Sequence, residues 1–210
     1  MADVRRVVDV EDRGGDREGG GCGHDCPILG GRRLRARPAR GTHARHTARV
    51  TDTSARTHIA QVRSSGAQRV GVLGFSAGGH LAGHAAATGL TELAVLCYPV
   101  VSMLTPTHAG SRENLLGPRP GRRARRATSI EHLVTPAMPP TFVWHTADDA
   151  LVPVEHAYLL GAALARHGVP HALHVYPSGV HGLGLASGSG DAERWTAECA
   201  AWLRGLGWGA

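Results

Sequence analysis

Five residues, Gly74-Phe75-Ser76-Ala77-Gly78, constrain the fold of this chain more than any other segment. An apolar run over residues 69–75 leads into them, and an Ala-, Gly- and Leu-rich stretch follows to residue 88. The apolar run predicts a strand and the following stretch predicts a helix. A serine in a G-x-S-x-G sequence at such a junction lies on a sharp, strained turn with its hydroxyl exposed. The alternative interpretation is a tight turn with an idle serine.

Strands and helices continue to alternate after this turn. We predict strands over residues 92–101, 141–147 and 171–176, and helices over residues 154–167 and 191–203. The last helix places Trp195, Cys199 and Trp202 on one face. This alternation predicts an α/β fold, with a mostly parallel sheet flanked on both faces by helices.

One long polar stretch, residues 102–135, interrupts this pattern. We predict a surface insertion between two strands. Its centre, residues 122–126, has the sequence RRARR. A basic run of this kind is typical of a solvated face, and contact with a nucleic acid is the less favoured interpretation.

Charge is divided unevenly along the 210 residues, which carry a formal net charge of +6 and no lysine. Residues 1–69 contain fourteen arginines and eight acidic residues, whereas residues 70–210 contain nine of each and all nine aromatic residues. Because the surplus charge lies where there are no aromatic residues, we predict no nucleic-acid partner. No apolar run approaches the ~20 residues of a membrane span. Residues 1–15 lack the apolar stretch of a signal peptide, so we predict a cytoplasmic location and no membrane partner. The oligomeric state stays open.

The first part of the chain is predicted to differ from the rest. We divide the chain into an atypical Arg/Gly-rich segment, residues 1–68, and a catalytic domain, residues 69–210. Residues 4–10 predict a short strand, but residues 30–69 show no period of 2 or 3.6 and have the composition of disorder. Cys22, His24 and Cys26 suggest a metal clip, yet no second ligand pair follows at finger-like spacing, so we predict no metal.

A serine nucleophile needs a base and an acid that orients the base. Two carboxylates, Asp148 and Asp149, follow a predicted strand, and the D-x-x-V-P spacing favours Asp149, with Asp148 expected to be a solvated neighbour. His181 lies in the loop after the last predicted strand, and glycines on both sides of the Val-His pair suit a mobile loop. The order Ser76, Asp149, His181 is that of α/β hydrolases. The N–H of Ala77, at the start of a helix, is predicted to face a developing oxyanion.

The remaining histidines are predicted to be structural. His80 and His84 are four residues apart on one helix, but without the glutamate of an H-E-x-x-H zinc site they are expected to be packing or surface residues. A hydrogen-bonding role is expected for the histidines on predicted strands, which are His145, His171 and His174.

Several segments together resemble bacterial α/β-hydrolase-fold esterases of the acetylesterase and acetyl-xylan-esterase-like branch, related to the hormone-sensitive-lipase-like enzymes. They are VGVLGFSAGGHLAGH, CYPVVSM, GSRENLLG, PPTFVWHTADDALVPVEH and SGVHGLGLA, and they span roughly residues 69–208. The resemblance implies Ser76 as nucleophile, Asp149 as acid and His181 as base. It also implies hydrolysis of short acyl esters without a cofactor, such as acetyl groups on sugars.

The front of the chain departs from this family. Gly20 and Gly21 lie in a Gly19–Cys22 stretch that resembles the family's GGGY oxyanion loop, but no hydrophobic strand lies directly before it. The interval from there to Ser76 is also short for the elements that such enzymes place there. We hypothesise that residues 1 to about 65 are not the family's own amino-terminal half, either because the reading frame is altered or because the segment is disordered.

The leading functional hypothesis is a serine carboxylic-ester hydrolase with a small-molecule ester substrate and an acyl-enzyme intermediate. One alternative is a prolyl-oligopeptidase-like serine peptidase, which has the same order of catalytic residues. The other is a catalytically impaired, truncated relic of a hydrolase.

Overall fold

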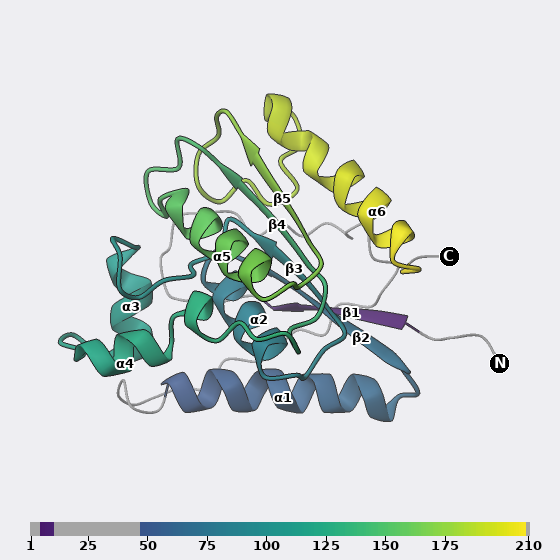
Figure 1. The fold of residues 1–210 in the computed structure, drawn as a ribbon, viewed down its shortest axis with the longest axis horizontal. Coiled ribbons are helices and arrows are strands. Elements are labelled where there is room, and N and C mark those ends of the chain that lie inside the picture. The colour runs from purple at the N-terminus through teal and green to yellow at the C-terminus, as the bar shows by residue number, and fades with distance from the viewer. Residues whose placement is uncertain (1–4, 11–46, 209–210) are drawn as a thin grey trace.

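The protein folds around a five-stranded parallel sheet whose strand order follows the chain order (Figure 1). The structure is a computed structural model that describes residues 5–10 and 47–208. The strands are β1 (Arg5–Val10), β2 (Arg69–Phe75), β3 (Leu93–Cys97), β4 (Thr141–Thr146) and β5 (His171–Tyr176). Each strand pairs in parallel with the next, so all carboxyl ends lie at the same edge of the sheet. The predicted α/β fold is confirmed.

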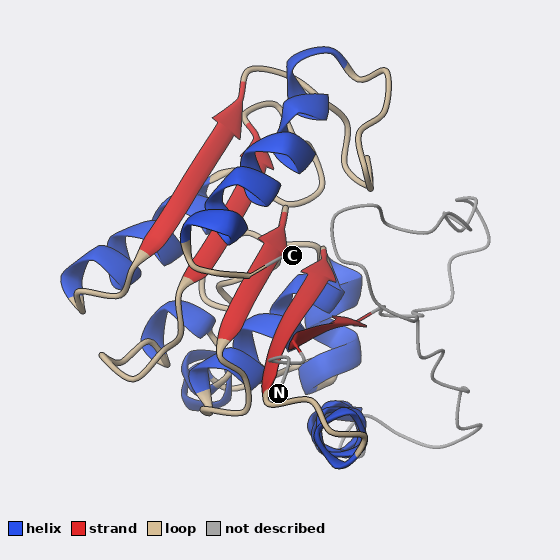
Figure 2. Cartoon of the chain, turned by 90° about the vertical axis from the view of Figure 1, so that its right-hand side faces the viewer, coloured by secondary structure: helices blue, strands red, loops and turns tan. Residues whose placement is uncertain are grey.

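Helices cover both faces of the sheet (Figure 2). The helices are α1 (Thr47–Ser64), α2 (Ala77–Ala87), α3 (Ala109–Leu116), α4 (Arg122–Ala127), α5 (Glu155–Arg166) and α6 (Trp195–Gly205). Short 3-10 helices lie at Ile130–His132 and Gly190–Arg194. Figure 1 shows α6 on the opposite side of the sheet from α1, α2 and α5. Within the described ranges, no helix is both long enough and apolar enough to cross a membrane.

Alternate residues of the central strands contribute to two separate cores. In β3, Ala94 and Leu96 pack with the α2 and α5 side, whereas Leu93, Val95 and Cys97 pack with the α6 side. All five residues of β3 are buried, because neither face of the sheet meets water. A strand buried on both faces is apolar throughout rather than alternating, which is why these strands were visible in the sequence.

Helix α1 corrects one expectation. No helical period was expected between residues 30 and 69, yet residues 47–64 form an 18-residue helix. Ala55, Ile59 and Val62 are buried at helical spacing, and Ile59 and Val62 pack against Val70 of β2. The composition of this segment does not indicate a helix, because a surface helix needs apolar residues only along the stripe that faces the core. The division of the chain at residues 68 and 69, and the hypothesis for the front segment, stay predictions.

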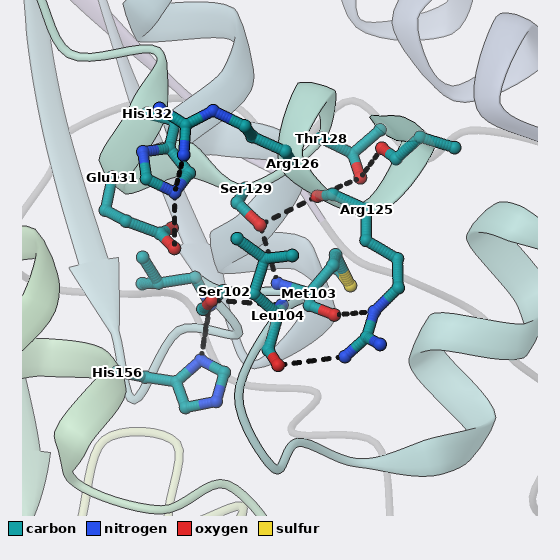
Figure 3. A network of polar contacts seen from close by, with 12 residues as sticks. Ser102, Met103, Leu104, Arg125, Arg126, Thr128, Ser129, Glu131, His132 and His156 are labelled. Carbon is teal, nitrogen blue, oxygen red and sulfur yellow. Dashed lines mark hydrogen bonds and ion pairs between the residues drawn. The ribbon is translucent and has the colours of Figure 1, made fainter. Parts of the chain in front are cut away.

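The predicted insertion, residues 102–135, is tied to the domain by a polar network (Figure 3). The hydroxyl of Ser129 accepts a hydrogen bond from Met103 N at 2.8 Å, and the Arg125 guanidinium donates to the carbonyls of Met103 and Leu104. Arg122 and Arg123 are exposed, as expected of a solvated basic face, but Arg125 is not. Arg125 therefore corrects the expectation for the RRARR run: this arginine fixes the insertion.

Candidate active site

The turn after β2 has the backbone conformation that the G-x-S-x-G sequence predicts. Ser76 has φ 54° and ψ −119°, a conformation that L-residues rarely adopt. Two backbone hydrogen bonds hold it there: Ser76 N donates to Cys97 O at 2.9 Å, and Val100 N donates to Ser76 O at 3.1 Å. A Cβ on Gly74 would lie 2.2 Å from the carbonyl oxygen of Gly78, so only glycine fits at position 74.

Ser76, His181 and Asp149 meet at the carboxyl edge of the sheet. The Oγ of Ser76 lies 2.7 Å from Nε2 of His181, and Nδ1 of His181 lies 2.6 Å from Oδ2 of Asp149. The imidazole is 13% exposed and the carboxylate is fully covered. With the serine hydroxyl donating to Nε2, the proton on Nδ1 points to the carboxylate. The structure therefore brings together the three residues that the sequence selected.

The Asp149 carboxylate is held in its ionised form. Its Oδ1 accepts the backbone N–H of Leu151 at 2.9 Å and that of Val152 at 3.0 Å. Burial raises the pKa of this carboxyl, but the hydrogen bond from His181 and the two backbone hydrogen bonds outweigh burial, so the pKa lies below its ordinary value of 3.8. A buried carboxylate that stays charged can hold the imidazole in one orientation and stabilise it when protonated.

Asp148 has a different partner. Its Oδ1 accepts the backbone N–H of Gly179 at 2.7 Å, and of the two neighbouring aspartates Asp149 is the one that contacts His181. Asp148 was expected to be a solvated neighbour. Its side chain is exposed, but it is bonded to the loop that carries the imidazole. That loop is thus held at Gly179, in contrast to the mobile loop that its glycines suggested.

Tyr98 supports the imidazole, and nothing in the sequence singled it out. Its ring lies edge-on to the ring of His181, with centroids 5.0 Å apart. Its hydroxyl accepts the backbone N–H of Gly184 at 2.9 Å. Tyr98 has φ 36°, so the chain turns sharply directly after β3. The available signal was a tyrosine followed by proline at the end of a buried apolar run, which marks the end of the strand.

The predicted oxyanion donors are only partly within the described residues. Ala77 is the first residue of α2 and directly follows Ser76, so its N–H belongs to the first helical turn, whose N–H groups have no partner inside the helix. Gly20 and Gly21 lie outside the described residues, as do Cys22, His24 and Cys26. The oxyanion roles of Ala77, Gly20 and Gly21 stay predictions, and so does the absence of a metal at Cys22, His24 and Cys26.

A sequence model of the prolyl oligopeptidase family matches residues 47–206, which is most of the chain. The chain belongs to the prolyl oligopeptidase family. This membership confirms the resemblance to α/β hydrolases stated from the sequence, and the match begins at the first residue of α1.

Three proteins with described activities are similar to this member of the prolyl oligopeptidase family. Endo-1,4-beta-xylanase B of Butyrivibrio fibrisolvens is 36% identical over 131 residues, which are 55% of this chain and 21% of that protein. An acetylxylan esterase of Xylanibacter ruminicola is 30% identical over 150 residues, 65% of this chain and 30% of that protein. The crystal structure of an acetyl ester-xyloside bifunctional hydrolase from Caldicellulosiruptor lactoaceticus superimposes with a TM-score of 0.71 at 37% identity. That superposition covers 76% of this chain and 65% of the other. The chain therefore spans less than a third of the length of the two curated relatives.

Two further histidines of this member of the prolyl oligopeptidase family, His80 and His156, are buried and bond the backbone after β3. His80 bonds the carbonyl of Val100 at 3.1 Å, and burial lowers its pKa to about 4. His156 accepts the N–H groups of Val101 at 2.8 Å and Ser102 at 3.1 Å. Burial lowers the pKa of His156 as well. His80 and His156 are therefore neutral in the folded protein, and their hydrogen bonds hold backbone groups in place.

The strand histidines also have polar partners. His145 bonds Thr146 O at 3.0 Å, His171 bonds Val169 O at 2.8 Å, and His174 lies 2.9 Å from a carboxylate oxygen of Glu198. In the part of the chain that the structure describes, no group of three or more His, Cys, Asp or Glu side chains is placed to hold a metal ion.

Proposed function

We propose that this chain is a serine carboxylic-ester hydrolase that acts on short acyl esters, in particular acetyl esters of carbohydrates. The observation that carries the proposal is the continuous contact from Ser76 Oγ to His181 Nε2 and from His181 Nδ1 to Asp149 Oδ2, at 2.7 and 2.6 Å. Such a chain of contacts gives a serine hydroxyl a base at its proton and gives the base a fixed tautomer.

The first half of the reaction transfers the acyl group to the protein. His181 Nε2 takes the hydroxyl proton of Ser76 as Oγ attacks the ester carbonyl carbon. The carbonyl oxygen becomes an oxyanion, and the N–H of Ala77 donates to it at the helix terminus. When the tetrahedral intermediate collapses, the bond to the alcohol oxygen breaks, and His181 returns the proton to that oxygen. The alcohol leaves, and the acyl group stays on Ser76.

The second half repeats these steps with water. His181 takes a proton from a water molecule, whose oxygen attacks the acyl carbon of the Ser76 ester. Collapse then breaks the bond to Ser76 Oγ, which regains its proton from His181, and the carboxylic acid leaves. Asp149 remains ionised throughout and stabilises the imidazolium, in keeping with its depressed pKa. Every step uses side-chain and backbone groups of the chain, and the proposal includes no cofactor.

The choice of substrate class is supported by the relatives. Two of them are described as an acetylxylan esterase and an acetyl ester-xyloside hydrolase, at 30% and 37% identity. A small acetyl group on a sugar hydroxyl is the substrate that these descriptions share. Predictions of a cytoplasmic location, and of no nucleic-acid or membrane partner, accompany this proposal and are open to cell fractionation and binding assays.

The direct test is turnover of p-nitrophenyl acetate and of acetylated xylo-oligosaccharides by the wild-type chain. We expect a burst of p-nitrophenol equal to the protein concentration, and loss of both burst and turnover in Ser76→Ala. Ser187→Ala, which removes an exposed serine, is the matched control and should behave as the wild type. Intact-mass spectrometry after treatment with a fluorophosphonate should show one adduct, located at Ser76. Equal turnover by the wild type and Ser76→Ala would contradict the proposal.

A peptidase is the second candidate, since the family takes its name from prolyl oligopeptidases. Comparing kcat/KM for a prolyl p-nitroanilide with that for p-nitrophenyl acetate separates the two. We expect the ester to be preferred. The impaired-relic alternative is tested by a thermal scan with circular dichroism, in which a single cooperative transition speaks against it.

A further inference from the structure

The end of strand β4 positions Asp149 and also contacts the loop that carries His181. The three residues Thr146, Asp148 and Asp149 lie at its carboxyl end, and all three contact the loop that carries the imidazole. Asp149 contacts His181 itself, whereas Thr146 and Asp148 contact Gly179, two residues earlier. The same short segment therefore sets both the position of the acid and the position of its partner loop.

Both backbone polar groups of Gly179 are held. The Thr146 hydroxyl donates to the Gly179 carbonyl at 2.7 Å, and the Asp148 carboxylate accepts the Gly179 N–H at 2.7 Å. Contact is close enough that a Cβ on Gly179 would lie 2.9 Å from the Thr146 methyl group and 2.8 Å from Leu183 Cδ1. Both backbone groups of Gly179 are therefore fixed to residues at the end of β4.

The residues on either side of His181 are open to solvent. Val180 is 75% exposed, and a Cβ on Gly182 would meet nothing within 4 Å. The next backbone anchor is Gly184, whose N–H donates to the hydroxyl of Tyr98 at 2.9 Å. His181 thus lies between two anchored glycines, and these backbone anchors act together with Asp149 and the Tyr98 ring to set its distance from Ser76.

We propose that Asp148 is a positioning residue for His181. It acts through the N–H of Gly179, not by contact with the imidazole or the substrate, and it keeps Nε2 of His181 within hydrogen-bonding distance of Ser76 Oγ. This inference rests on the proposed function, because its effect on rate requires that His181 is the base. The required property of Asp148 is a hydrogen-bond acceptor at Oδ1 and not its negative charge.

Three variants test the inference by steady-state kinetics with p-nitrophenyl acetate. Asp148→Ala removes the acceptor, Asp148→Asn keeps an acceptor oxygen without the charge, and Asp191→Ala removes an exposed aspartate elsewhere. We expect Asp148→Ala to lower kcat by about 10- to 100-fold with KM within about twofold, because small misplacement of a reacting group is costly. Asp148→Asn should retain kcat within a few-fold of the wild type, and Asp191→Ala should match the wild type.

Amide hydrogen exchange provides a readout that does not depend on turnover. The Gly179 amide should exchange at least tenfold faster in Asp148→Ala than in the wild type, with Asp148→Asn close to the wild type. A kcat for Asp148→Ala equal to that of the wild type overturns the inference, and so does Asp148→Asn as impaired as Asp148→Ala. Unchanged Gly179 exchange in Asp148→Ala also overturns it. Failure of the proposed function is distinguishable, because it appears as equal turnover by the wild type and Ser76→Ala, whatever the exchange data show.

Discussion

The carboxylate of Asp149 lies 2.6 Å from Nδ1 of His181, and its second oxygen is held by two backbone N–H groups of its own loop. The two oxygens of Asp149 therefore have separate partners, the imidazole for Oδ2 and the backbone for Oδ1. The Asp149 carboxylate is fully covered, while the His181 imidazole is 13% exposed. Under the proposed function Asp149 orients His181, so its carboxylate must be ionised and held in place, and the hydrogen bonds that outweigh the cost of burial serve both conditions.

Replacing Asp149 with asparagine should separate these two conditions. The amide oxygen can still accept the backbone hydrogen bonds, but the amide no longer carries the charge that stabilises the protonated imidazole. We expect kcat for p-nitrophenyl acetate to fall by about 10³- to 10⁴-fold with little change in thermal stability. Stopped assays at high enzyme concentration measure the residual rate, and circular dichroism measures the fold. A loss smaller than tenfold would contradict the role given to Asp149.

A methyl group at Gly74 should be costly for stability. The new Cβ would lie 2.2 Å from the carbonyl oxygen of Gly78, a backbone atom in a turn that has little freedom to shift. We expect Gly74→Ala to lower the free energy of unfolding by at least about 2–3 kcal/mol, as for other overpacked sites. Gly121→Ala is the matched control, since a Cβ there meets nothing within 4 Å. Urea denaturation compares the two, and equal midpoints would refute the close approach.

Protonation of His80 should couple stability to pH. Its pKa is about 4 in the folded protein and 6.5 when unperturbed, so between these values the unfolded chain binds more protons. Stability is therefore fully present above about pH 6.5 and falls as the pH drops toward 4. The loss from this residue is about 3 kcal/mol. His145 and His156, whose pKa values burial also lowers, act in the same direction.

Urea denaturation at a series of pH values between 7.5 and 4.5 measures this dependence. We expect the slope of unfolding free energy against pH to be smaller in His80→Gln, which cannot take up the proton. Ser187→Ala, which removes an exposed side chain that does not titrate in this range, is the control and should leave the slope unchanged. A slope in His80→Gln equal to that of the wild type would assign the pH dependence to other groups.

The hydrogen bonds of the His156 ring should be needed to hold the start of the insertion in place. Its ring bonds the N–H groups of Val101 and Ser102 and the carbonyl of Pro106, at 2.8, 3.1 and 2.9 Å. His156→Leu leaves these buried groups without their partner, which costs about 1–3 kcal/mol for each unsatisfied group. We expect a clear drop in the urea midpoint and faster amide exchange over residues 101–106. Ser187→Ala, at an exposed position outside this network, should be nearly neutral.

Most of the strands, and the turn that holds Ser76, could be predicted from the sequence. Strand β2 matches its prediction, and β4 and β5 agree to within one residue, because buried parallel strands are apolar throughout. Strand β3 is shorter than predicted. The apolar run continues past Cys97, but Tyr98 adopts a positive φ and turns the chain out of the sheet. Hydrophobicity alone does not record that turn.

The contacts that support the His181 imidazole could not be predicted from the sequence. Asp148 and Tyr98 reach His181 or its loop across 31 to 86 residues of sequence, through contacts with backbone groups of Gly179 and Gly184. A backbone N–H is the same at every non-proline residue, so a partner of this kind leaves no pattern in the sequence. The sequence does not indicate helix α1, because over residues 55–64, where burial is described, three buried apolar side chains lie among polar ones.

Strand order that follows chain order also bears on biosynthesis. Each strand pairs with the strand that precedes it in the sequence. As the chain leaves the ribosome, Ser76 emerges first, Asp149 follows after β4, and His181 emerges only after β5. Under the proposed function, a nascent chain that stalls before residue 181 therefore carries the serine without its base and cannot hydrolyse an ester.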